Sequence, residues 1–136
     1  MAIPTGSGTE VLKNTSILGF SGSGNGPWSV RWDGVTLDAE NSTFAVPTNH
    51  IITVLNFSFC NTHETNTYPF SLIVRTQGSA TDKFILHTVS VGSLETFVWN
   101  EKIVLNSGDK LLFDDPTADG GDDADIMISY IDQDWS

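Results

Sequence analysis

The chain has 136 residues, and its 6 Lys and Arg against 17 Asp and Glu give a formal net charge of −11 at pH 7. This length fits one domain, and the single cysteine, Cys60, excludes an intrachain disulfide. An acidic surface repels nucleic acid and anionic lipid, and no apolar run reaches the roughly 18 residues of a membrane helix. We therefore expect neither nucleic acid nor a membrane among the partners.

Residues 1–13, MAIPTGSGTEVLK, form an unusual opening. They have neither the basic start nor the continuous apolar core of a secretory signal. Instead, Ile3, Val11 and Leu12 are spaced along a segment that Pro4 keeps extended. Ordering such a segment costs about 1–2 kcal/mol of backbone entropy per residue, which strand addition to a neighbouring sheet edge offsets. We expect an extended N-terminal arm over residues 1–13 that takes part in assembly, and a disordered tail is the alternative.

Apolar and polar residues alternate along most of the remaining chain, and helical periodicity is almost absent. Such alternation places successive side chains on opposite faces of a half-buried strand. The expected strands are PWSVRW (27–32), HIITVLNFSFC (50–60), PFSLIVRT (69–76), KFILHTVSV (83–91), TFVW (96–99), the two halves of KIVLNSGDKLLF (102–113) and DIMISYI (125–131). About seven or eight short strands predict an all-β fold, a single-domain β-sandwich or jelly roll over residues 14–136.

The alternation also predicts which side chains face the core. The expected inward residues are Trp28, Val30, Trp32, Ile51, Leu55, Phe57, Phe59, Phe70, Leu72, Val74, Ile103, Leu105, Leu111, Phe113, Ile126, Ile128 and Tyr130. The strand at 83–91 leaves two sets open, which are Phe84 with Leu86, or Ile85 with Val89 and Val91. The turn between the strands of 102–113 contains Gly108, which is free to take a positive φ.

Residues 114–125, DDPTADGGDDAD, form an acidic loop with six carboxylates. The loop does not match an EF-hand, because with Asp115 as its first ligand the third position is Thr117 and the twelfth is Ile126 in place of Glu. An irregular calcium site therefore stays open as an alternative. The preferred interpretation is a solvated turn loop.

The remaining motifs favour neither a metal centre nor catalysis. The zinc-ligand types are Cys60, His50, His63 and His87, and only Cys60 and His63 stand at a ligand-like spacing, with no second pair. The sequence lacks a G-x-S-x-G elbow, and its Gly-rich stretch at 22–26 lacks the Lys of a phosphate-binding loop. We expect no enzyme activity, no metal and no cofactor, although seventeen acids make some chance carboxylate pair inevitable.

Four tryptophans offer flat apolar rings of the kind that bind sugars in carbohydrate-binding β-sandwiches. Trp28 and Trp32 share a strand face with Val30, so a core position is the preferred interpretation for both. Trp99 is a further candidate, and Trp135, which is the penultimate residue, is expected either to pack on a neighbour or to fray. A carbohydrate-binding module therefore stays open as an alternative function.

Several stretches of the chain resemble small virion proteins of tailed bacteriophages, including those of the cyanophage type. They are residues 1–13, VPTNHIITVLNFSFCN (46–61), and KIVLNSGDKLLF (102–113) followed by DIMISYI, and together they cover about half of the chain. The size, the single domain and the all-β pattern resemble a capsid decoration, or cement, protein most closely.

The resemblance implies a homotrimer on the outer face of the phage head that binds the major capsid protein and stabilises the shell. It implies a location on the virion exterior, after synthesis in the host cytoplasm. The residues we expect at the assembly interface are Ile3, Pro4, Val11, Leu12, Trp28 and Trp135. A tail, neck or fibre component of the virion is the alternative within the same group.

Overall fold

A computed structural model describes residues 8–20, 27–32, 44–116 and 124–135, and these contain nine strands and no helix. Within them, no helix is long and apolar enough to cross a membrane. The strands are β1 Thr9–Phe20, β2 Trp28–Ser29, β3 His50–Asn61, β4 Tyr68–Arg75, β5 Lys83–Val91, β6 Thr96–Trp99, β7 Ile103–Leu105, β8 Lys110–Asp114 and β9 Ala124–Asp134.

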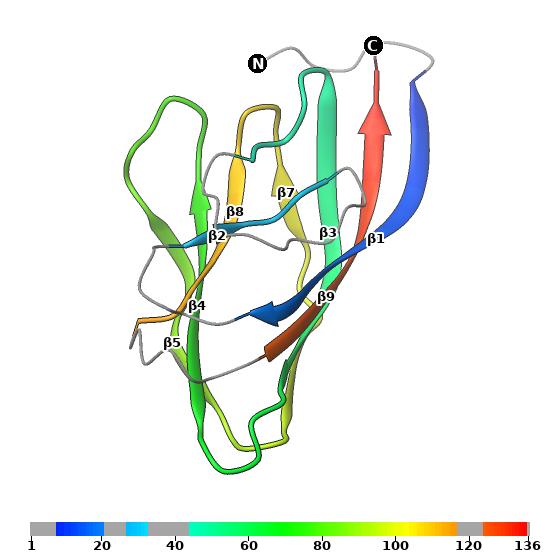
Figure 1. Cartoon of the computed structure of the whole chain (residues 1–136). Helices are drawn as coiled ribbons and strands as arrows, with labels where there is room; N and C mark the ends of the chain where they lie inside the picture. The colour runs from blue at the N-terminus through cyan, green and yellow to red at the C-terminus, as the bar shows by residue number, and fades with distance from the viewer. Residues whose placement is uncertain (1–7, 21–26, 33–43, 117–123, 136) are drawn as a thin grey trace.

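Two antiparallel sheets make up the fold (Figure 1). The first has the order β1-β9-β3-β6, with β7 pairing on the same edge of β3, and the second has the order β2-β8-β4-β5. Most successive strands change sheet, as they do in a jelly roll, and only β4 with β5 and β6 with β7 stay in one sheet. The predicted all-β sandwich is therefore confirmed.

Aromatic side chains fill the space between the two sheets. Phe57 and Phe59 from β3 meet Phe70 from β4 and Phe113 from β8, and all four are buried. The rings of Phe59 and Phe70 stack with centroids 4.2 Å apart, while Phe57 meets Phe113 edge to face at 5.3 Å. The predicted inward faces of β7, β8 and β9 are confirmed, because their alternating apolar residues are buried in this core.

The predicted inward face of β3 is wrong over its first half. Ile52 and Val54 are buried there, whereas Ile51 and Leu55 are only partly covered. The pairing with β9 shifts register between Val54 and Asn56, and an extra residue in one strand reverses the faces on either side of it. A prediction that assumes strict alternation along the whole strand therefore assigns the wrong residues to the core on one side of such a bulge.

In β5 the structure decides between the two sets that the sequence left open. Val91 is buried and Ile85 and Val89 pack against the core, while Phe84 is 48% exposed. Leu86 is also partly buried, because the pairing of β4 with β5 shifts register on both sides of Leu72. The strand therefore lacks a strict alternation.

The predicted boundary after residue 13 differs from the structure. Residues 9–13 belong to β1 and pair with β9 of the same chain, from Thr9 opposite Asp134 to Lys13 opposite Tyr130. β9 is 11 residues long, so its far end offers backbone partners that satisfy the N–H and C=O groups of this segment. The sandwich thus includes Thr9 onward, and Ile3 and Pro4 lie outside the described residues.

Candidate functional site

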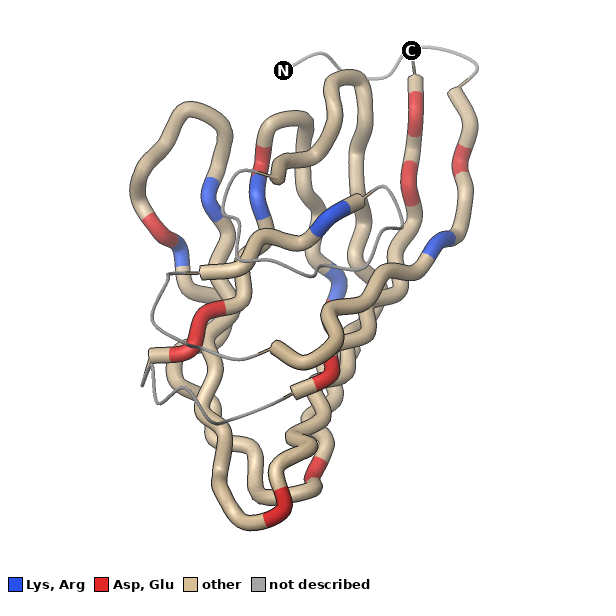
Figure 2. The backbone as a smooth tube through the Cα atoms, viewed as in Figure 1, with Lys and Arg blue, Asp and Glu red and all other residues tan. Residues whose placement is uncertain are grey.

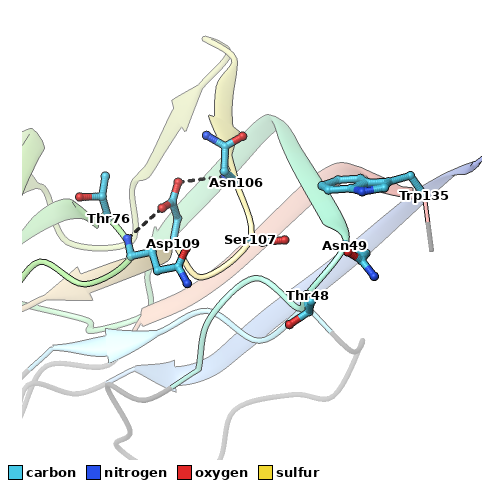
Figure 3. A pocket seen from close by; sticks show the side chains of 8 residues that line it. Thr48, Asn49, Thr76, Asn106, Ser107, Asp109 and Trp135 are labelled. Carbon is cyan, nitrogen blue, oxygen red and sulfur yellow. Dashed lines mark hydrogen bonds between the residues drawn. The ribbon is translucent and has the colours of Figure 1, made fainter. Parts of the chain in front are cut away.

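A pocket of about 440 Å³ lies at the end of the sandwich near the C-terminus (Figure 3). Four separate segments line it: the turn before β3, the end of the β4 region, the turn between β7 and β8, and the residue after β9. The lining residues are Thr48, Asn49, Thr76, Gln77, Asn106, Ser107, Asp109 and Trp135.

Asp109 fixes two of these segments to one another. Its carboxylate accepts a hydrogen bond from the backbone N–H of Gln77 at 3.1 Å and another from that of Asn106 at 2.9 Å. The side chain is buried, and its own backbone N–H donates to the carbonyl of Asn106 at 3.0 Å. Both carboxylate oxygens thus hold backbone, so hydrogen bonds within the chain fix this wall of the pocket.

The turn between β7 and β8 is also tied to the segment that precedes β3. The backbone N–H of Gly108 donates to the carbonyl of Val46, and that of Val46 donates to the carbonyl of Asp109, both at 2.9 Å. The hydroxyl of Ser107 donates to the carbonyl of Pro47 at 3.0 Å. Gly108 has a φ of 84°, so the positive φ predicted from the sequence is confirmed.

Trp135 forms the far side of the pocket. Its backbone N–H donates to the carbonyl of Asn49 at 3.1 Å, and Asn49 has a φ of 64° in the left-handed region. Figure 3 shows the indole reaching in from the side opposite Thr76 and Asn106. Trp135 is partly exposed, so the end of β9 presents an apolar ring to a pocket whose other lining residues carry polar groups.

Trp28, in contrast, is a core residue. It is 7% exposed and meets Phe20 edge to face, with ring centroids 5.1 Å apart. Trp32 is also buried and packs on Tyr130 at 4.9 Å. The core interpretation of both tryptophans is confirmed. The assembly expectation required an exposed ring at Trp28, whereas this ring is buried in its own chain.

A second cavity, of about 300 Å³, lies beside an ionic cluster that joins three strands of the first sheet. Asp132 of β9 accepts from Lys13 of β1 at 2.7 Å and lies 2.6 Å from the Nδ1 of His50 in β3. Burial alone would raise the pKa of Asp132, but the hydrogen bonds from Lys13 and His50 outweigh it and hold that pKa below its ordinary value. The cluster therefore holds β1 and β3 onto β9.

The zinc-ligand types lie apart from one another. His50 binds Asp132, His63 accepts from the backbone N–H of Asn66 at 3.0 Å, and His87 packs on Phe84 with ring centroids 4.3 Å apart. Within the described ranges, no three His, Cys, Asp or Glu side chains are placed to share a metal ion.

Most of the acidic loop, residues 117–123, lies outside the described residues, and with it the calcium alternative. At the start of the loop, burial raises the pKa of Asp114, and the neighbouring carboxylates of Asp115 and Asp82 raise it further. Asp125 at the end of the loop accepts from the backbone N–H of Gly19 at 3.0 Å.

The outer face of the first sheet carries two rows of uncharged side chains that run across its strands. Strands β3, β6 and β7 contain no Lys, Arg, Asp or Glu, and β9 has none between Asp125 and Asp132 (Figure 2). We call this surface the uncharged face, and its paired rows are Leu12, Ile131, Thr53 and Val104, and Ser16, Met127, Ser58 and Val98.

The uncharged face exposes large apolar side chains. Leu12 is 70% exposed, Val104 61%, Met127 58% and Val98 56%. On β1, β9 and β3 the residues between the two rows are Asn14, Ser129 and Asn56, which are polar but uncharged. At the edge of the face, the connection from β6 to β7 contains the exposed Glu101 and Lys102. On a chain with a net charge of −11, the two rows are a surface without carboxylates, and the acidic Glu101 at its edge is followed by the basic Lys102.

Sequence reasoning included Trp135 and Leu12 among the interface residues but missed the pocket and most of the uncharged face. The pocket joins residues 48–49, 76–77, 106–109 and 135, and no local pattern signals that these meet. The uncharged face did leave a signal, because the polar positions of β3 that alternate with its core residues are Thr, Asn and Ser without a single charge.

No protein-family profile matches the chain, and no curated protein matches it. Among solved structures, it is similar to Eiger TNF from S. frugiperda, with 14% identity and a TM-score of 0.35 over 90% of this chain and 92% of that chain.

Proposed function

We propose that this chain is a non-enzymatic structural protein, a decoration protein of a tailed-phage capsid. In this proposal it assembles as a homotrimer, binds the major capsid protein on the outside of the virion and stabilises the shell. The resemblance of residues 1–13, 46–61 and 102–113 to small virion proteins supports the phage assignment. The uncharged face is the observation that supports assembly.

Electrostatics limits where two copies of this chain can meet. Each copy carries a formal charge of −11, and like charges brought together at an interface cost several kcal/mol. The uncharged face reduces that cost, because no charged side chain lies within its rows and Glu10 and Asp125 lie beyond them. At its edge, the charge of Glu101 is followed by the opposite charge of Lys102. Burying apolar area there contributes roughly 25 cal/mol per Å².

The size of the face indicates that the interface continues onto a strand edge. The two rows are four residues apart along β1, which separates them by about 14 Å at the rise of a strand. Each row crosses four neighbouring strands, so it is about 14 Å long at the usual spacing between strands. A standard interface buries about 800 Å² on each partner. Further area is available on β1, an edge strand on which Val11 and Leu18 are 46% and 55% exposed.

Light scattering coupled to gel filtration tests the assembly. The full chain should elute as an oligomer, most simply a trimer, and Met127→Glu with Val98→Glu should weaken association at least tenfold, because each places a carboxylate in one of the two rows of the face. Leu94→Glu is the matched control, since Leu94 is 64% exposed in the turn between β5 and β6. A monomer of 14.8 kDa at micromolar concentration, or no effect of the face variants, contradicts the proposal.

The virion location needs a separate measurement. A density map of the head of the phage that encodes this chain should show the sandwich on the outer surface. In a separate assay, the purified protein should sediment with expanded heads. Density at the tail, neck or fibre would favour the alternative virion component, which the uncharged face supports equally. Absence from purified virions would contradict both.

A further inference from the structure

We infer that the pocket lined by Asn49, Gln77, Asn106 and Trp135 is a binding site for a neutral saccharide. This function is additional to assembly and uses a different surface, since the pocket lies at the loop end of the sandwich and the uncharged face lies on the outside of the first sheet. Its volume of about 440 Å³ falls within the roughly 300–1,000 Å³ of small-molecule sites.

The pocket has a fixed backbone and unused side chains. Asp109 holds the backbone of Gln77 and Asn106, and Trp135 is bound through its backbone to Asn49. Within the described part of the chain, the side-chain amides of Asn49, Gln77 and Asn106 make no hydrogen bond. A pre-organised wall lowers the entropy cost of binding, and the amides remain available to a ligand.

The chemistry of the available groups matches sugar hydroxyls. An amide offers both donors and an acceptor, and the hydroxyls of Thr48 and Thr76, which also line the pocket, donate and accept as well. A sugar ring presents hydroxyls of the same dual character around its edge.

The charge of the pocket selects a neutral ligand. Asp109 is the only charged residue among the described lining residues, and both of its oxygens already accept backbone hydrogen bonds. It therefore has little left to attract a cation. An anionic ligand is disfavoured by the net charge of −11 on the whole chain.

Trp135 supplies the apolar surface that a saccharide needs. Its indole extends into the pocket opposite Thr76 and Asn106 (Figure 3), so a flat ligand between them has a ring on one side and polar groups on the other. One face of a pyranose is formed largely by C–H groups, and an aromatic ring buries large area against such a face.

Titration of the isotope-labelled full chain, followed by NMR, tests this site. The probes are methyl glucoside, methyl galactoside, methyl mannoside, N-acetylglucosamine and, as the charged comparison, N-acetylneuraminic acid. We expect at least one neutral sugar to shift the indole N–H of Trp135 and the side-chain amides of Asn49, Gln77 and Asn106. We expect a Kd of about 1 mM, so the sugar concentration in the titration should reach about ten times that value.

Variants locate the binding and separate it from assembly. Trp135→Ala and Asn106→Ala should each weaken it at least tenfold, and Gln133→Ala, on the neighbouring part of β9 but outside the pocket lining, should leave it unchanged. The absence of any shift with all neutral probes, shifts that map elsewhere, or tighter binding of N-acetylneuraminic acid would overturn the inference. Met127→Glu, which tests assembly, should not alter sugar binding.

Discussion

Replacing Asp109 by Ala should destabilise the fold more than any change at an exposed acid. Asp109 is 7% exposed, and its carboxylate accepts two backbone hydrogen bonds, at 3.1 Å from Gln77 and 2.9 Å from Asn106. A hydrogen bond to a charged group contributes about 1.5–3 kcal/mol, and a buried donor left without a partner costs about 1–3 kcal/mol. Because the two bonds share one carboxylate, we expect a loss of about 2–4 kcal/mol.

Urea unfolding at pH 7 measures this loss. Domains of this size have a total stability of about 5–15 kcal/mol, so the midpoint should fall visibly while the slope stays constant. Asp109→Asn keeps one acceptor oxygen and should lose about half as much. The control is Glu64→Gln at an exposed turn position, for which we expect a change within about 0.5 kcal/mol. If Asp109→Ala matches this control, Asp109 does not hold the pocket.

Two further predictions concern the pH dependence of stability. The folded pKa of Asp132 is lowered, so its contribution is present above the unfolded value of about 3.9 and is lost as pH falls through the folded pKa. Lys13→Met, which removes one of its partners, should reduce the difference in urea midpoint between pH 7 and acid, and an unchanged difference would argue against the cluster. The pKa of Asp114 is raised by burial, so its ionised form is destabilising above that pKa and the penalty disappears as pH falls below about 3.9. Asp114→Asn should therefore raise the Tm at pH 7 but not in acid, and a Tm lowered at pH 7 would contradict this reasoning.

Local pattern alone determined the fold class and much of the core. Alternation in KIVLNSGDKLLF and DIMISYI marks Leu105, Phe113 and Tyr130 as inward residues, and all three are buried. Gly108 takes the positive φ that its turn requires. These features are local, because the period of two and the conformational freedom of glycine belong to the strand or turn itself.

Tertiary structure decided the registers. The bulge between Val54 and Asn56 in β3 exists in the pairing with β9, a strand about seventy residues away in the sequence, and it changes which residues face inward. Likewise, residues 9–13 join the sandwich because the far end of β9 offers them partners. An alternating pattern reports the two faces of a strand but not its neighbour, so neither result follows from the pattern.

Both proposed surfaces depend on contacts between segments that are distant in sequence. Asn49, Gln77, Asn106 and Trp135 reach one pocket through four different segments, and the rows that contain Leu12, Met127 and Val98 form only when β1, β9, β3 and β6 pair in one register. Composition does predict a net charge of −11. The folded sheet decides which part of the surface lacks charged side chains, because pairing brings the uncharged positions of separate strands onto one face.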